Sequence, residues 1–323
     1  MKVAVITPPV FAINSSLDYG GLERFLYYCC KALTDHMEVV LFAPEGSAVE
    51  GVKVVETVEP GAKWDKTAEQ RAFDVYKDLM KESSVIWDHT HEYKPYANRE
   101  HPIVHTCHGV QTQCVNNRNF PCLTTISRWH SEDVRRKFGF SSTTVPLCID
   151  FNDYGQGEGG DGSLLFGLLA PHKGQLEALE VLGKVKVAGE DKFVPDISYP
   201  DKVKEKSEYL GQVKEGKKRE LLCAADCVII NSKTPEAFSM LALESMACGT
   251  PVLFRKLGVA EEMIEDGMGF VYESEKDLPR LVERCKILDR KRVRSLAKVR
   301  WDASVVAREY AEVLKMTVDG VVW

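Results

Sequence analysis

The stretch Thr234-Pro-Glu-Ala-Phe-Ser-Met-Leu-Ala-Leu-Glu-Ser-Met-Ala-Cys-Gly-Thr-Pro251 carries the strongest structural pattern in the sequence. Its middle part, from about Ser239 to Ala247, consists of good helix formers and predicts a helix. Gly249 and Pro251 end that helix. The apolar residues 252–254 then predict a strand, so the stretch reads as turn, helix and strand.

Two carboxylates accompany this helix. Glu236 lies just before it and Glu244 lies within it. The first amides of a helix have no partner in the helix and carry a partial positive charge, so they attract an anion such as a diphosphate. Carboxylates beside that anion could accept hydrogen bonds from the hydroxyl groups of attached sugars. Taken alone, the same residues also fit an ordinary amphipathic helix with solvated carboxylates.

The stretch resembles the Glu-x7-Glu signature of the retaining nucleotide-sugar glycosyltransferases of family 4, which have the GT-B fold. Ala237 and Ser239 stand where that family usually has proline and glycine. The matching residues are Glu236, Phe238, Leu243, Glu244, Met246, Ala247, Cys248, Gly249, Pro251 and Val252. This resemblance implies that Glu236 binds the transferred sugar and that Glu244 binds the ribose. It also implies that the amides of Phe238, Ser239, Met240 and Leu241 bind the diphosphate.

Composition limits the class of protein. The chain has 323 residues, 44% of them hydrophobic, which suits about two domains of roughly 150 residues each. Its apolar runs fall far short of the ~18 residues of a membrane helix, and Met1-Lys2 leads straight into an expected strand, so we expect a cytoplasmic protein. The net charge of −6 argues against an extended nucleic-acid surface. The ten cysteines include no Cys-x-x-Cys pair, which argues against a zinc knuckle.

The first half begins with a predicted strand at 2–7, a long loop ending in Gly20-Gly21, and a predicted helix at 22–33. A glycine pair after a strand brings backbone amides close to a ligand, although it equally fits a plain turn. The loop resembles the first loop of family 4 enzymes, and this implies that Gly20 and Gly21 border donor and acceptor.

Histidines follow two predicted strands. In Asp88-His89-Thr90-His91 both histidines could share one face of an extended segment, but without a third ligand nearby the pattern does not favour a metal site. The strand at 103–109 ends in His108-Gly109, and a single histidine at a strand end is more often structural. This ending resembles the family's Thr-x-His-Gly, whose histidine contacts the donor sugar, so the resemblance makes His108 a predicted site residue.

The second half contains a partial match to the family's Gly-Arg-x-x-x-x-Lys-Gly segment, in which arginine and lysine bind the donor diphosphate. Gly167 and Lys173-Gly174 fit this pattern, but Leu168 occupies the arginine position. Leucine carries no charge and donates no hydrogen bond, so one charge-assisted contact is absent. Lys233, in the loop before Glu236, is a candidate substitute for that cation.

Alternating strands and helices predict α/β domains with parallel sheets and with ligands at the carboxyl ends of the strands. We place the boundary in the glycine-rich run 153–162. The expected domains are an acceptor-side Rossmann-like domain at 1–155 and a nucleotide-sugar-binding domain at 156–302. The resemblance implies the GT-B arrangement of two domains facing across a cleft, with a terminal helix at about 303–323 packing back on the first domain.

The predicted function, implied by the resemblance, is metal-independent retaining transfer of a sugar from a nucleotide-diphosphate sugar, UDP- or GDP-linked, to a hydroxyl acceptor. No cofactor or metal is expected. The catalytic residues would be Glu236, His108 and Lys173. The acceptor could be a glycan, a lipid or a small molecule, and the cluster Arg135-Arg136-Lys137 would allow peripheral membrane contact, although a solvated helix end fits it better.

Two alternatives stay open. The absent arginine at position 168 suggests a catalytically impaired nucleotide-sugar-binding protein. The expected fold also accommodates a nucleotide-sugar epimerase or a phosphorylase.

Overall fold

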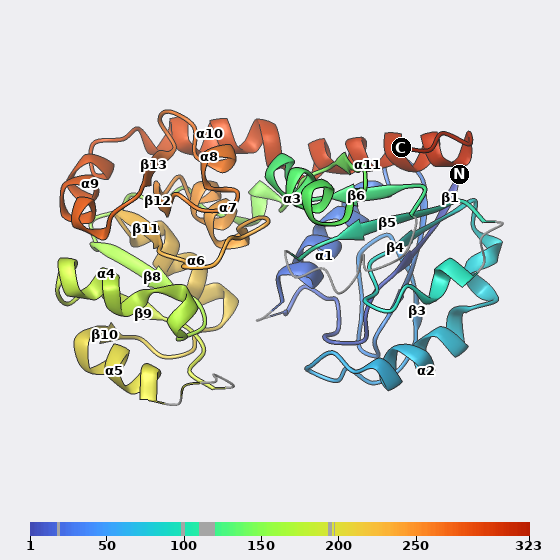
Figure 1. The fold of residues 1–323 in the computed structure, drawn as a ribbon, viewed down its shortest axis with the longest axis horizontal. Coiled ribbons are helices and arrows are strands. Elements are labelled where there is room, and N and C mark those ends of the chain that lie inside the picture. The colour runs from blue at the N-terminus through green and yellow to red at the C-terminus, as the bar shows by residue number, and fades with distance from the viewer. Residues whose placement is uncertain (18–19, 98–100, 110–119, 193–195, 197) are drawn as a thin grey trace. The chain divides into compact units, whose positions relative to one another are not determined.

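The chain forms two compact units, and each is described by itself (Figure 1). The first unit comprises residues 1–150 and 301–323, and the second comprises residues 151–300. The glycine-rich run at 153–162 therefore belongs to the second unit. The computed structural model describes residues 1–17, 20–97, 101–109, 120–192, 196 and 198–323.

The first unit contains a parallel sheet of seven strands in the order β3-β2-β1-β4-β5-β6-β7. Its strands are β1 (Lys2–Ile6), β2 (Glu38–Ala43), β3 (Lys53–Glu56), β4 (Val85–Asp88), β5 (Ile103–Cys107), β6 (Leu123–Thr125) and β7 (Thr143–Thr144). Apolar β-branched residues dominate β1, β2 and β4, and these strands are almost wholly buried, as expected for a sheet covered on both faces. The sheet order changes direction between β1 and β4.

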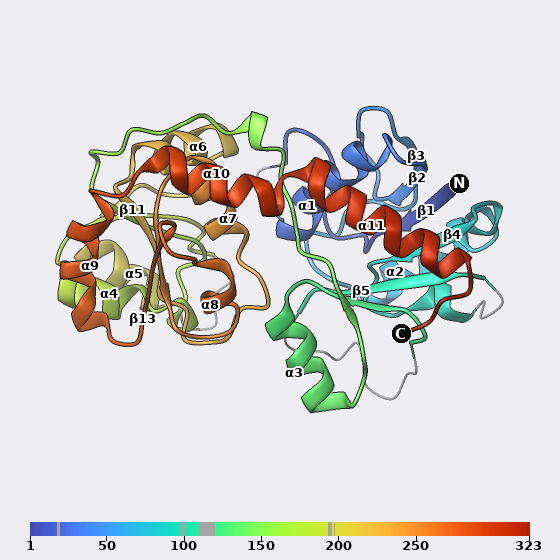
Figure 2. The same cartoon turned by 90° about the horizontal axis from the view of Figure 1, so that it is seen from above.

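The helices of the first unit are α1 (Gly21–Leu33), α2 (Lys66–Tyr76), α3 (Arg128–Phe138) and α11 (Ala303–Val318). Helix α11 packs against α1, β4 and β5, although it lies far from them in sequence (Figures 1 and 2). The phenol of Tyr310 on α11 donates a hydrogen bond to the Val145 carbonyl at 3.2 Å. Its ring lies 4.3 Å from that of Trp87 on β4. The C-terminal helix is therefore part of the core of the first unit.

The second unit contains a parallel sheet of six strands in the order β10-β9-β8-β11-β12-β13. Its strands are β8 (Ser163–Phe166), β9 (Lys186–Ala188), β10 (Glu208–Tyr209), β11 (Cys227–Ile230), β12 (Val252–Arg255) and β13 (Gly269–Tyr272). Its helices are α4 (Gln175–Leu182), α5 (Ser198–Lys206), α6 (Glu215–Ala224), α7 (Met240–Ala247), α8 (Ala260–Met263), α9 (Leu278–Cys285) and α10, which runs over Arg290–Trp301 into the first unit. Here the strand order changes direction between β8 and β11.

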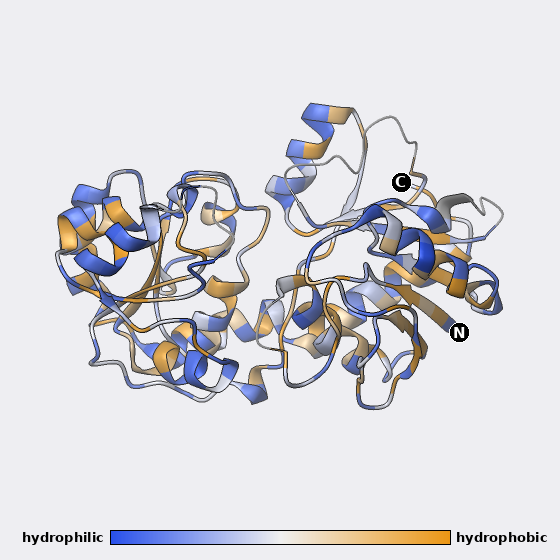
Figure 3. Cartoon of the chain, turned by 90° about the horizontal axis from the view of Figure 1, so that it is seen from below, coloured by the Kyte–Doolittle hydropathy of each residue, from blue (hydrophilic) through white to orange (hydrophobic). Residues whose placement is uncertain are grey.

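Apolar strands carry the cores of both units, and their ribbons are orange in Figure 3. In the second unit, side chains of β8, β9, β11 and β12 pack with those of α4 and α9. The prediction of two α/β units with parallel sheets is confirmed. Among the helices of the described residues, none has the length and apolar character that crossing a membrane requires.

Candidate functional site

Two predicted site residues form an ion pair in the second unit. Lys173 lies in the turn after β8 and Glu236 lies in the loop after β11, and these two strands are adjacent and parallel in the sheet. The Lys173 Nζ atom lies 2.7 Å from Glu236 Oε1. The pair therefore sits at the carboxyl edge of the sheet where the strand order reverses, which is where ligands bind in open α/β sheets.

Side-chain and backbone hydrogen bonds join the two loops that carry this pair. The Asn231 side chain donates to the Gly174 carbonyl at 2.7 Å and accepts from the Tyr272 hydroxyl at 2.7 Å. The Lys233 amide donates to the His172 carbonyl at 2.7 Å. Gly174 has a φ of 67°, and a Cβ there would collide with the Asn231 backbone. The loops after β8 and β11 consequently form one fixed platform beneath Lys173 and Glu236.

A third loop, after β12, holds the backbone of Glu236. The Val259 amide donates to the Glu236 carbonyl at 3.0 Å. Gly258 has a φ of 64°, and a Cβ at this position would lie 2.5 Å from the Glu236 carbonyl oxygen and 2.6 Å from its nitrogen. Only glycine fits this close approach of two backbones.

Replacing Gly258 with alanine should therefore destabilise the second unit by about 1–3 kcal/mol and displace Glu236, because both the positive φ and the collision oppose the new methyl group. Thermal unfolding and the release of nucleoside diphosphate from a nucleotide sugar would measure the two effects. Gly216→Ala is the matched control, since a Cβ on this α6 residue meets nothing within 4 Å. The control should keep or slightly raise stability. Equal behaviour of the two variants would contradict the prediction.

Helix α7 begins beside Glu236. Ser239 is its N-cap, and the Ser239 hydroxyl accepts a hydrogen bond from the Ala242 amide at 3.5 Å. Phe238, Met240 and Leu241 are partly exposed, whereas the helix is buried from Ala242 onward. The partly exposed start of α7 is thus the part of the helix that a ligand next to Glu236 would meet.

Glu244 lies one turn further along α7, and its carboxylate is engaged inside the unit. Its side chain is 1% exposed and forms an ion pair with Lys218 of α6, which is 13% exposed. The Tyr154 hydroxyl also donates to Glu244 Oε1 at 3.4 Å. The Lys218 ammonium lies 5.5 Å from the centre of the Phe166 ring at the end of β8. Sequence reasoning missed Lys218, because α6 shows only a solvated mixture of charges and no motif.

Leu168 and Lys233 lie on the same platform. The Leu168 carbonyl accepts a hydrogen bond from the Gln175 side chain at 2.8 Å, so this turn is held through its backbone. The Lys233 ammonium is paired with Glu177 of α4. Lys233 is therefore paired with a carboxylate, as Lys173 is paired with Glu236.

The remaining predicted residues, Gly20, Gly21 and His108, belong to the first unit. Gly21 is the first residue of α1, and Phe25 on this helix lies 6.0 Å, centre to centre, from the His108 ring. His108 directly follows β5, and its Nε2 atom lies 2.8 Å from Nδ1 of His89, which directly follows β4. The two imidazoles share one hydrogen bond at the carboxyl edge of the first sheet, close to the point where its order reverses.

The side chains of Asp88 and His91, on either side of His89, contact groups other than His108. Asp88 Oδ2 lies 3.1 Å from His105 Nδ1, and His91 Nδ1 lies 3.0 Å from Glu69 Oε1. His89 and His91, which the sequence could place on one face, therefore contact different groups. Within the described residues, no cluster of three or more histidine, cysteine, aspartate or glutamate side chains is arranged to hold a metal ion.

Burial lowers the pKa of both His89 and His108 well below the ordinary value, and neighbouring histidines lower it further. The folded protein therefore keeps both rings neutral, whereas the unfolded chain protonates them below about pH 6.5. Because the unfolded chain then binds more protons, stability should fall as the pH decreases from that value. Buried His130, with its pKa lowered to about 4, acts in the same direction. Glu23, whose pKa burial raises to about 7, acts in the opposite direction.

We expect the melting temperature of the wild type to fall between about pH 7.5 and about pH 5.5, each buried histidine contributing at most about 1.4 kcal/mol per pH unit. The double variant His89→Leu/His108→Leu should show a shallower dependence, because two of the groups that take up protons on unfolding are gone. His36→Gln, at an exposed site, is the control. An unchanged slope in the double variant would contradict this account.

Residues 155–294 match the family model described as glycosyl transferases group 1. This range lies within the second unit and includes Lys173, Glu236 and Glu244. No curated protein matches the sequence at a significant level.

Solved structures with the GT-B fold align along nearly the whole chain. AviGT4, a glycosyltransferase of avilamycin A biosynthesis, has a TM-score of 0.77 at 20% identity over 100% of this chain and 99% of its own. Sucrose-phosphate synthase from Thermosynechococcus elongatus has a TM-score of 0.79 at 14% identity over 99% of each chain. Anabaena HepE, in complex with UDP-glucose, has a TM-score of 0.74 at 18% identity over 98% of this chain and 99% of its own. The predicted GT-B fold class is confirmed.

Proposed function

We propose that this chain, a glycosyltransferase by its group 1 domain, moves a sugar from a nucleotide-diphosphate sugar to a hydroxyl acceptor, with retention of configuration and without a metal. The observation that carries the proposal is the ion pair of Lys173 and Glu236 beside the exposed start of α7. This arrangement offers a cation and helix amides to a diphosphate, and a carboxylate to sugar hydroxyls. All three features lie within residues 155–294.

Each group has a role in donor binding. Lys173 and the first amides of α7, at Phe238 to Leu241, would hold the diphosphate, while Glu236 would accept hydrogen bonds from the transferred sugar. Glu244 would bind the ribose hydroxyls through a carboxylate that Lys218 now neutralises. The binding of UDP-glucose by HepE, which shares the fold, supports a UDP-linked donor.

Catalysis would then rest on positioning and on stabilising the charge of the leaving group. As the bond between the anomeric carbon and the diphosphate breaks, negative charge grows on the phosphate oxygens, where Lys173 and the helix amides offset it. The acceptor hydroxyl attacks the same face of the sugar, and the departing diphosphate oxygen takes its proton, so configuration is retained. Glu236 fixes the sugar for this attack.

The first unit would supply the remaining contacts. His108 would touch the transferred sugar, and Gly20 and Gly21 would bring the start of α1 close to donor and acceptor. The hydrogen bond between His89 and His108, at 2.8 Å, occupies Nε2 of His108 and orients its ring.

A second candidate function is nucleotide-sugar binding without efficient transfer, and Leu168 favours it because the family's second diphosphate-binding cation is absent at this position. Substituting Leu168 with arginine separates the two functions. A sharp rise in turnover would support an impaired enzyme, whereas unchanged turnover would support the transferase as it stands.

The test of the proposed function is a thermal-shift panel of UDP, GDP, ADP and their glucose conjugates, with and without magnesium, followed by measurement of nucleoside diphosphate release. A ligand that binds only the folded protein raises its melting temperature. We expect one nucleotide family to raise it without magnesium, and Glu236→Gln to keep the shift while losing most of the release. A panel without any shift would contradict the proposal.

A further inference from the structure

Two cysteines of the second unit meet at the C-terminal ends of two packed helices. Cys223 is the last residue but one of α6, and Cys248 is the C-cap of α7. The Thr250 hydroxyl donates to the Leu222 carbonyl at 2.6 Å, which joins the main chains next to both cysteines. The thiols of Cys223 and Cys248 form a hydrogen bond with each other. The pair is therefore built by the packing of α6 on α7 and by no spacing in the sequence.

The glycine-rich run at 153–162 holds the backbones of both cysteines. The Gly157 amide donates to the Cys248 carbonyl at 2.8 Å, and the Gly159 amide donates to the Cys223 carbonyl at 3.2 Å. A Cβ at Gly157 would lie 2.2 Å from the Cys223 carbonyl oxygen, so only glycine fits this approach. These contacts fix the main chains that carry the two thiols.

The two thiols differ in their access to solvent. Cys248 is 0% exposed, whereas Cys223 is the one cysteine among the described residues that is not buried. The Cys223 thiol donates to the Gly155 carbonyl at 3.3 Å. A small oxidant that arrives from solvent would therefore meet Cys223 before Cys248.

Arg290 and Arg294 of α10 bring positive charge to this pair. Arg290 donates to the Cys223 carbonyl at 3.1 Å, and Arg294 donates to the Ala247 carbonyl beside Cys248. The hydrogen bond from the Cys248 thiol, together with these two charges, lowers the pKa of Cys223 to about 7. The same hydrogen bond and burial raise the pKa of Cys248. Cys223 is therefore the member of the pair that ionises near neutral pH, and the thiolate is the reactive form.

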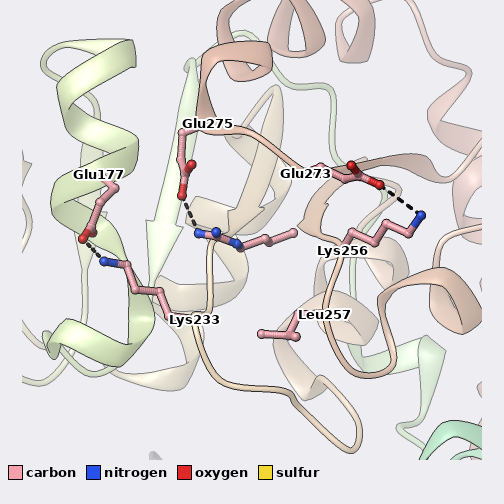
Figure 4. A pocket seen from close by; sticks show the side chains of 7 residues that line it. Glu177, Lys233, Lys256, Leu257, Glu273 and Glu275 are labelled. Atoms are coloured by element: carbon pink, nitrogen blue, oxygen red, sulfur yellow. Dashed lines mark hydrogen bonds and ion pairs between the residues drawn. The ribbon is translucent and has the colours of Figure 1, made fainter.

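These arginines differ in their partners from the cations around a cavity of about 650 Å³ at the carboxyl ends of β11, β12 and β13 (Figure 4). The cations of the cavity form ion pairs with carboxylates: Lys233 with Glu177, Arg255 with Glu275, and Lys256 with Glu261 and Glu273. Arg290 and Arg294 donate to backbone carbonyls, which carry no net charge. In these contacts no carboxylate offsets the charge that stabilises a thiolate at Cys223.

We propose that Cys223 and Cys248 form an oxidation site for a hydroperoxide such as hydrogen peroxide. The thiolate of Cys223 attacks one peroxide oxygen and the O–O bond breaks, which leaves a sulfenic acid on Cys223 and a hydroxide that takes up a proton to form water. The sulfur of Cys248 then attacks the sulfur of Cys223 and the S–O bond breaks. The hydroxyl group leaves with the Cys248 proton as a second water, and a disulfide remains. The two thiols lose two electrons, and the peroxide gains them.

This site does not depend on the proposed transferase function. The disulfide would join α6 to α7 about one turn beyond the Lys218–Glu244 ion pair, which joins the same two helices. A thiol reductant would reverse the modification by exchange.

Mass spectrometry of the full wild-type chain tests the site. The reduced protein is treated with hydrogen peroxide, its remaining thiols are alkylated in denaturant, and the chain is digested with trypsin and with a protease that cleaves before aspartate. Asp226 lies between Cys223 and Cys227, so this digestion separates these two cysteines. We expect a peptide pair in which Cys223 is joined to Cys248 and which dithiothreitol separates.

The matched control is a second thiol pair in the same digest. Cys227 and Cys285 also form a thiol–thiol hydrogen bond, but they are only 0% and 2% exposed. Because peroxide reacts with accessible thiolates, this pair should be oxidised at least about tenfold more slowly than Cys223 and Cys248.

Two variants test the order of the steps. In Cys248→Ala the sulfenic acid of Cys223 has no second thiol to react with, so dimedone should label it, whereas Cys248 should stay unlabelled in Cys223→Ala. The site is overturned if Cys223 stays reduced in the wild type, if Cys223 joins another cysteine in place of Cys248, or if Cys227 and Cys285 are oxidised as fast. Labelling of Cys248 in Cys223→Ala would show that the assigned order of attack is wrong.

Discussion

Replacing Lys173 with methionine should lower the release of nucleoside diphosphate from the matching nucleotide sugar by about 100-fold, the usual effect of removing one group that stabilises transition-state charge. Lys173 is the cation that the structure places 2.7 Å from Glu236 beside the start of α7. Its charge would oppose the negative charge that grows on the departing diphosphate. The loss should therefore appear mainly in kcat, with a smaller rise in KM. Steady-state kinetics of diphosphate release would measure both.

Two further variants make this prediction specific. Lys173→Arg keeps the charge and should retain more activity than Lys173→Met, although the guanidinium has a different shape. Lys298→Met removes an exposed lysine of α10 and should leave the kinetics unchanged. If Lys173→Met raised KM and left kcat unchanged, the lysine would bind the donor equally in the ground state and the transition state. It would then not contribute to catalysis.

Replacing Lys218 with methionine should destabilise the second unit by about 3–5 kcal/mol, because it leaves the buried carboxylate of Glu244 without its cation. Glu244 is 1% exposed, so water cannot take over the lost interaction. The hydrogen bond that Tyr154 donates to Glu244, at 3.4 Å, is too long to compensate for the lost ion pair. The measurement is the unfolding transition of the second unit in urea.

The double variant Lys218→Met/Glu244→Leu should recover most of the stability, since no unpaired charge is left. Lys217→Met is the matched control on the same helix. It breaks an ion pair with Glu220 in which both partners are exposed, and it should cost less than about 1 kcal/mol. If Lys218→Met were no more harmful than Lys217→Met, the buried ion pair would not contribute to the stability of this unit.

Much of the candidate site was predictable from sequence because local chemistry determines it. Helix formers and the Gly249 stop predict α7 within one residue of its observed bounds, Met240–Ala247. Short apolar runs separated by helical patterns predict parallel sheets, because helices cover both faces of such sheets and their strands are therefore apolar throughout. These inferences depend on residues that are close in the chain, where sequence spacing translates directly into geometry.

The tertiary structure decides which side chains of the candidate site contact one another. Lys173 and Glu236 were predicted as separate site residues, and they meet because β8 and β11 pair in the sheet although many residues separate them. Other contacts also follow from the packing of elements that no local pattern links. They join Glu244 to Lys218, Lys233 to Glu177, and His108 to His89.

The chain alone therefore determined the fold class, the helix that begins the proposed donor site, and the residue types around it. Only the folded units decided which charges are matched and where a cavity remains, as between the loops after β11, β12 and β13. The physical reason is that secondary structure responds to short-range propensity and periodicity, whereas the partner of a charged side chain depends on which distant segments the sheet order brings together.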